Sequence, residues 1–114
     1  MKPLNQEPLT SARREARVER RALGEMPTIW DQLVDYHGRP MPGVRALNPE
    51  RAVADFPRLA QLRWIGGGRW ADLGSGASGS TVTDLVVWLA GGCERSKAVA
   101  FLEATLAELD ANAA

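Results

Sequence analysis

The feature that most constrains the fold is a glycine triplet between two short β-rich runs. The runs cover residues 62–65 (LRWI) and 69–73 (RWADL), and residues 66–68 are all glycine. Aromatic and branched residues on both sides of a glycine turn predict a β-hairpin. Much of the chain's large apolar content lies in this hairpin and in the segment after it, so residues 62–109 are expected to organise the fold.

Two helices are predicted after the hairpin. A Gly/Ser-rich loop leads to Thr81, which forms a capping-box-like helix start with Asp84 three residues later. This helix is expected over residues 82–90 and ends at the glycine pair 91–92. A second helix is expected over residues 94–110. We expect the two helices to pack against each other and against the hairpin.

The N-terminal region is far more polar. Residues 1–9 contain two prolines and no periodicity, which predicts a flexible tail. A helix over residues 10–24 carries only a thin apolar stripe, so it has little surface to bury. It is either a solvated, loosely docked helix or an arm that binds a partner. Its basic residues, the candidate partner contacts, are Arg13, Arg14, Arg17, Arg20 and Arg21.

Three middle segments complete the expected fold. Residues 28–37 have the spacing of an amphipathic helix, residues 38–48 contain two prolines and two glycines and predict a loop, and residues 48–56 predict a short helix. A chain of 114 residues supports one core. The sequence therefore predicts a single α+β domain over residues 10–114, a small β-hairpin packed with about four helices.

Composition excludes several classes of site. The only cysteine is Cys93 and the only histidine is His37, so an intramolecular disulfide and a multi-cysteine zinc site are excluded. Acid–base catalysis needs a tuned pair, and neither residue has an evident second member. We therefore expect no enzyme, no metal and no cofactor. With no signal peptide and no long apolar run, we expect a cytoplasmic protein without membrane contact.

Charge distribution suggests an anionic partner for the middle of the chain. The formal net charge is zero, but residues 39–69 contain six arginines and two acids. Two tryptophans interleaved with arginines on a small sheet are able to stack on bases and contact phosphates. The alternatives stay open: an arginine-rich surface without such a role, and tryptophans that belong to the core. The candidate nucleic-acid contacts are Arg58, Arg63, Trp64, Arg69, Trp70, Ser78, Ser80 and Thr81.

The Gly/Ser loop has the glycine spacing of a Walker A motif but lacks its lysine. Ser80 stands where the lysine would hold the β- and γ-phosphates, so nucleotide hydrolysis is not expected. A loop that ends at a helix N-terminus is a generic anion site. Ser78, Ser80 and Thr81 are therefore candidates to bind a phosphate, and a plain connecting loop is the alternative.

Part of the chain, residues 62–109, resembles the primase-type zinc-ribbon module of plasmid and phage replication proteins. The matching residues are Trp70, Gly76, Gly79, Asp84, Leu85, Val86, Gly92, Ala98 and Leu102. No cysteine pair remains, so the resemblance is to relatives that have lost the metal. It implies a primase-associated accessory protein of a mobile element that contacts single-stranded DNA or a primase- or helicase-type protein. The alternative is a protein–protein adaptor or inhibitor that binds an acidic host or phage partner.

Overall fold

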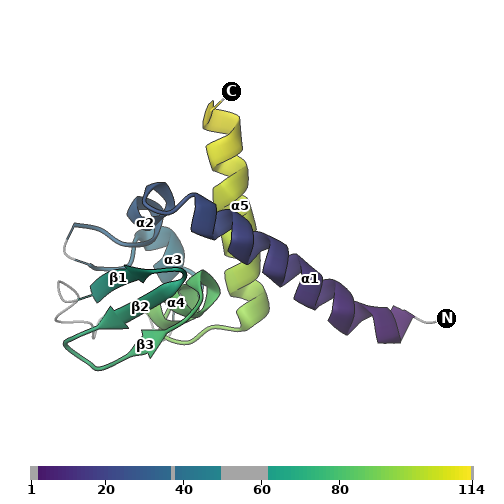
Figure 1. The fold of residues 1–114 in the computed structure, drawn as a ribbon, viewed down its shortest axis with the longest axis horizontal. Coiled ribbons are helices and arrows are strands. Elements are labelled where there is room, and N and C mark those ends of the chain that lie inside the picture. Colours follow the sequence, from purple (N-terminus) through teal and green to yellow (C-terminus); the bar gives the residue numbers. More distant parts are fainter. Residues whose placement is uncertain (1–2, 37, 50–61, 114) are drawn as a thin grey trace.

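The computed structural model describes residues 3–36, 38–49 and 62–113, with side chains from residue 11 onward. Within these ranges the chain is α+β, as predicted, with five helices and a three-stranded antiparallel sheet. Figure 1 shows the sheet beside α4, while α5 passes behind α1. The elements in chain order are α1 (Pro3–Gly24), α2 (Thr28–Leu33), α3 (Pro42–Arg45), β1 (Leu62–Gly66), β2 (Arg69–Asp72), β3 (Ser78–Gly79), α4 (Val82–Leu89) and α5 (Arg95–Ala113).

Strands β1 and β2 form the predicted hairpin. Their antiparallel register pairs Leu62 with Asp72 and Trp64 with Trp70. All three residues of the glycine triplet have positive φ, between 62° and 117°, a region that other residues rarely adopt. The triplet therefore lets the chain reverse within a few residues. The two-residue strand β3 adds to the free side of β2, within the segment that the sequence assigned to a loop.

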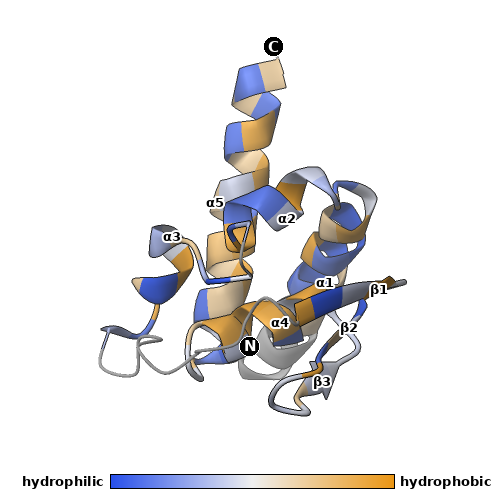
Figure 2. Cartoon of the chain, turned by 90° about the vertical axis from the view of Figure 1, so that its left-hand side faces the viewer, coloured by the Kyte–Doolittle hydropathy of each residue, from blue (hydrophilic) through white to orange (hydrophobic). Residues whose placement is uncertain are grey.

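Helix α4 lies in the middle of the core. The N–H of Asp84 donates to Oγ1 of Thr81 at 3.0 Å, which confirms the predicted helix start. In Figure 2 α4 is mostly apolar and lies between the sheet and α5. The indole of Trp70 in β2 lies against that of Trp88 in α4, with ring centroids 5.2 Å apart. The buried residues of the two packed helices are Val82, Thr83, Leu85, Val86, Leu89, Ala98, Val99, Leu102, Thr105 and Leu106.

Helix α1 begins at Pro3 and not at residue 10, so it includes residues of the predicted flexible tail. Proline is well placed at the first position of a helix, where its missing N–H costs no hydrogen bond. Figure 1 shows the N-terminal turns of α1 projecting away from the other elements. The C-terminal half of α1 is docked, and its buried apolar residues are Val18 and Ala22.

Charge pairs flank the docked surface of α1. Arg14 pairs with Glu103, with Nε 2.8 Å from Oε2, and Arg21 pairs with Asp110 at 2.5 Å, so two arginines of α1 bind α5. A third pair has its charges reversed: Glu15 of α1 binds Arg95 of α5 at 2.7 Å. The expected thin apolar stripe is thus real, and ion pairs flank it. The helix is therefore held in place although its apolar surface is small.

Helix α2 is shorter than predicted, because it ends at Leu33 instead of continuing to residue 37. Val34 is extended, with φ −132° and ψ 155°, and forms a β-bridge with Pro40. The carboxylate of Asp35 accepts hydrogen bonds from the backbone N–H and Nε of Arg39, at 2.8 and 3.0 Å. Such local side-chain bonds compete with the helix and close a turn instead.

The expectation of a structureless loop over residues 38–48 is also corrected. Pro42–Arg45 forms the single turn α3, with proline at its start, where its fixed φ suits a helix. Residues 50–56 of the predicted short helix lie outside the described residues, as does His37. No described helix has the length and apolar character needed to cross a bilayer.

Candidate nucleic-acid interface

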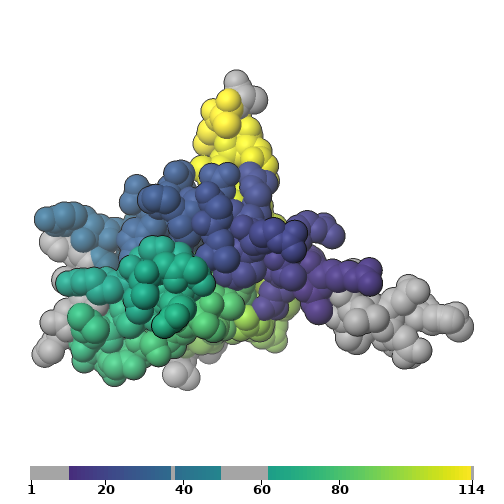
Figure 3. All heavy atoms as spheres, in the orientation of Figure 1, coloured from purple at the N-terminus to yellow at the C-terminus, as the bar shows by residue number. Residues whose placement is uncertain are grey.

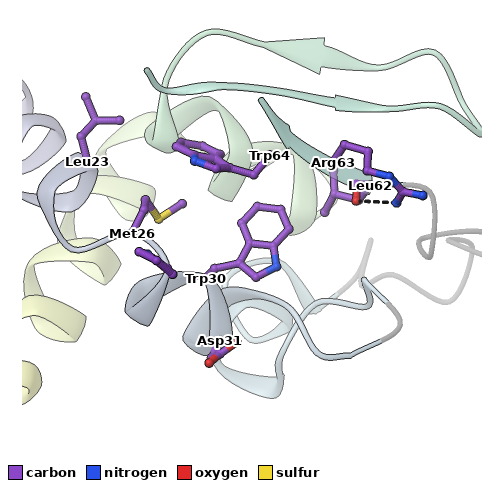
Figure 4. A pocket seen from close by; sticks show the side chains of 8 residues that line it. Leu23, Met26, Trp30, Asp31, Leu62, Arg63 and Trp64 are labelled. Atoms are coloured by element: carbon purple, nitrogen blue, oxygen red, sulfur yellow. Dashed lines mark hydrogen bonds between the residues drawn. The ribbon is translucent and has the colours of Figure 1, made fainter. Parts of the chain in front are cut away.

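A pocket of about 600 Å³ opens between the C-terminal end of α1, α2 and β1. Trp30 from α2 and Trp64 from β1 face each other in it, with ring centroids 6.1 Å apart and ring planes at 56° (Figure 4). Both indoles are half-buried, so each keeps some accessible surface. The remaining lining residues are Leu23, Met26, Pro27, Asp31, Leu62 and Arg63.

The position of each strand in the sheet decides which tryptophan is accessible. Trp64 and Trp70 are paired in the register and therefore share one face. Strand β1 is at the edge of the sheet and β2 is in its centre. Trp64 consequently borders the open pocket, whereas Trp70 is 2% exposed.

Trp70 is thus a core residue and not a base-stacking one, which corrects its place among the candidate contacts. Its indole N–H donates to the carbonyl oxygen of Thr81 at 3.1 Å, and its ring lies against Gly79 and Trp88. Neither ring face is open to a ligand. The alternative that at least one of the two tryptophans belongs to the core is confirmed.

The opposite face of the sheet carries exposed arginines. Arg63 pairs in register with Ala71, and Ala71 pairs with Ser78. Side-chain alternation places Arg69 on this face with them. Arg63 also lines the tryptophan pocket, and its Nη1 donates to the carbonyl oxygen of Leu62 at 3.1 Å. Arg63 therefore belongs to the exposed face of the sheet and also borders the pocket. Arg58, another predicted nucleic-acid contact, lies outside the described residues.

The anion site predicted at the start of α4 is filled by the protein itself. The carboxylate of Glu19 in α1 accepts hydrogen bonds from the N–H of Val82 at 2.6 Å and from that of Thr83 at 3.0 Å. Thr81 itself accepts the N–H of Asp84. These N–H groups have no partner within the helix, and a bound phosphate would need them as donors. The prediction of a phosphate at the helix start is therefore corrected, because Glu19 supplies the anion and Thr81 caps the helix; Ser78 and Ser80 are exposed and do not take part in these bonds.

The five arginines of α1 divide into two groups. Arg14 and Arg21 are paired with α5, and their hydrogen bonds lower the pKa values of Glu103 and Asp110. Arg13, Arg17 and Arg20 are exposed and form no ion pair with any residue that the structure describes. Arg14 and Arg21 are also partly exposed, but their guanidinium groups are already paired, so the second group is the better candidate to bind a partner.

Arg95 connects α5 to both α1 and α4. It binds Glu15 at 2.7 Å and Asp84 at 2.5 Å. Burial works against ionisation of Asp84, but hydrogen bonds from Arg95 and Thr81 outweigh it and lower the pKa of this carboxyl. The acids of the docking region are thus committed to internal pairs.

Among the described residues, neither a metal-ligand cluster nor a reactive thiol is evident. No three His, Cys, Asp or Glu side chains gather in metal-binding geometry within residues 11–36, 38–49 and 62–113. Cys93 is half-buried, and burial raises the pKa of its thiol. A raised pKa leaves less of the nucleophilic thiolate at neutral pH.

The chain matches no family model, and no curated protein or solved structure is significantly similar to it. Function must therefore be inferred from this surface.

Two residues described above were not predicted as functional from the sequence. Trp30 lies in the segment 28–37, for which the sequence predicts only an amphipathic helix, and Glu19 gave no signal because its contacts lie 63 and 64 residues away.

Proposed function

We propose that this chain is a small, non-enzymatic protein of the cytoplasm that binds single-stranded DNA. In this proposal Trp64, with Trp30, stacks on a base in the pocket, and Arg63 and Arg69 contact the adjoining phosphates. A role in the replication machinery of a plasmid, phage or other mobile element rests on the resemblance of residues 62–109 to primase-type modules.

The observation that carries the proposal is the pairing of accessible indoles with Arg63 at one pocket. Base–aromatic stacking combined with cationic contacts to the backbone is the usual basis of sequence-tolerant single-strand binding. The pocket lining holds one cation, Arg63, and one carboxylate, Asp31, so its charge is balanced and the two indoles dominate its surface.

Titration of a labelled oligothymidylate at low and increasing salt tests the proposal. Trp64→Ala should weaken binding by about 5- to 150-fold, which corresponds to the loss of one base stack. Arg63→Ala should also weaken binding, because Arg63 contacts a phosphate in this proposal. Its matched control is Arg45→Ala, which removes an exposed arginine of α3 away from the pocket. Absence of binding by the wild-type protein at low ionic strength would refute the proposal.

The alternative is an adaptor or inhibitor that binds an acidic protein. It is favoured by Ile65 and Leu73, which are 60% and 67% exposed next to the arginines of the hairpin. Affinity capture from host extract, with and without nuclease, separates the two functions. A protein that is retained after nuclease treatment and lost with Ile65→Asp would favour the adaptor.

A further inference from the structure

We propose that the outer arginines of α1 and the outer face of the β1–β2 hairpin form one continuous basic track for the phosphate backbone of a single strand. This inference rests on the proposed function and extends it. It joins two groups of residues that the sequence assigned to different partners.

The first support is the segregation of charge around α1. Spacings of four and three residues place Arg13, Arg17 and Arg20 on one face of the helix. The two acids of this helix whose side chains the structure describes, Glu15 and Glu19, point elsewhere, since Glu15 binds Arg95 and Glu19 caps α4. Internal pairing thus neutralises these two carboxylates, and the outer face between Arg13 and Arg20 is cationic along about 10 Å of helix.

The second support is a hollow at the C-terminal end of this face. A depression of about 320 Å³ is lined by Arg17, Arg20, Arg21, Gly24 and Glu25. Of these residues, Arg21 is already paired with Asp110 and lies 3.7 Å from the carboxylate of Glu25, so Arg17 and Arg20 are the guanidinium groups left for a ligand. Guanidinium groups bind phosphate oxygens with two parallel hydrogen bonds, which makes such a hollow suited to a backbone phosphate.

The third support is the contact between α1 and the hairpin. A Cβ added at Gly68 would lie 3.5 Å from Cδ2 of Leu23, so the hairpin turn touches α1 there. Arg20 lies one turn before Leu23, and Arg69 comes directly after Gly68. Figure 3 shows α1 and the hairpin side by side on one face of the molecule.

The same contact connects the track to the aromatic pocket, because Leu23 also lines that pocket. A partner that occupies both needs an extended chain of anions and flat rings attached to it. Single-stranded nucleic acid has both features. An acidic polypeptide would satisfy the arginines but has no regular supply of rings for Trp30 and Trp64.

The test compares two double variants with equal loss of charge. Arg17→Ala/Arg20→Ala removes the track, and Arg45→Ala/Lys97→Ala removes exposed cations elsewhere. Binding of a long oligothymidylate is measured over a range of salt concentrations. The slope of log affinity against log salt should fall by about 1.4 in the track variant, since each lost phosphate contact contributes about 0.7. The control variant should keep the wild-type slope. Circular dichroism verifies that both variants are folded.

Other outcomes overturn specific parts of the inference. If both double variants change the slope equally, or neither does, the track is wrong, while sensitivity of binding to Trp64→Ala would leave the proposed function intact. If polyglutamate competes as well as oligothymidylate of similar charge, the surface belongs to an acidic protein. If the wild-type protein does not bind oligothymidylate at all, both proposals fail.

Discussion

Glu19 in α1 and Thr83 in α4 are joined by two hydrogen bonds. The backbone N–H and the hydroxyl of Thr83 both donate to Oε1 of Glu19, at 3.0 and 2.9 Å. The second carboxylate oxygen accepts the N–H of Val82 at 2.6 Å. The first N–H groups of a helix lack partners within it, and Thr83 is fully buried. A helix distant in sequence therefore completes the cap of α4.

Glu19→Ala should lower the free energy of unfolding by about 1–3 kcal/mol, because it leaves buried donors without acceptors. Glu19→Gln keeps one acceptor oxygen and should cost less. Urea denaturation measures both. Glu108→Ala, at an exposed position of α5, is the control and should change stability by less than about 0.5 kcal/mol. Equal effects of Glu19→Ala and Glu108→Ala would contradict the capping role.

Acid should loosen the docking of α1. The pKa values of Asp84, Glu103 and Asp110 are lowered by hydrogen bonds from arginines, with Thr81 contributing at Asp84. Their stabilising contribution is therefore complete above the unfolded-state values near pH 4 and is lost as pH falls through the lower folded-state values. The protection factors of the α1 amides, which correct for the slower intrinsic exchange at low pH, should fall in this acidic range.

The double variant Arg14→Gln/Arg21→Gln provides the comparison for the acid effect. It removes the cations that lower the pKa values of Glu103 and Asp110, so its stability should depend less steeply on pH below about 4. Because these pairs are exposed and screened by solvent, its stability at neutral pH should fall only modestly. An unchanged pH profile would show that these pairs do not couple docking to protonation.

Gly79→Ala should be strongly destabilising. An added Cβ would lie 2.6 Å from three atoms of the Trp70 indole, which is itself held in the core. Overpacking of this kind costs about 1–3 kcal/mol. Gly24→Ala is the matched control, since nothing lies within 4 Å of its added Cβ. Thermal unfolding of the two variants should differ clearly, and similar melting temperatures would count against this packing.

The two tryptophans of the hairpin should respond differently to truncation. Trp70→Ala should cost about 3–5 kcal/mol of stability, as expected for a fully buried indole. Trp64→Ala should cost less because Trp64 is half-buried at the edge of the sheet. Chemical denaturation of both variants tests the separation between a core residue and a pocket residue. If Trp64→Ala were more destabilising than Trp70→Ala, Trp64 would be the core residue and the assignment of the two tryptophans would be wrong.

Local signals in the sequence were sufficient for the second half of the fold. The glycine triplet permits positive φ, and Thr81 caps the next helix, so the hairpin and α4 need only neighbouring residues to be specified. The same local reasoning failed at Val34. There the Asp35–Arg39 turn outcompetes a helix whose apolar spacing continues, and periodicity carries no information about that competition.

The sequence by itself determined the α+β class, the hairpin with its two faces, and the helix that begins after Thr81, because these depend on contacts between residues close in the chain. Only the tertiary structure decided which indole is open, which arginines of α1 are paired, and which group occupies the start of α4. Those outcomes depend on strand order and on contacts such as Glu19 with Val82, which join residues 63 positions apart. The packing of α1 against α4 and α5 thus fills the expected anion site and turns the remaining arginines outward.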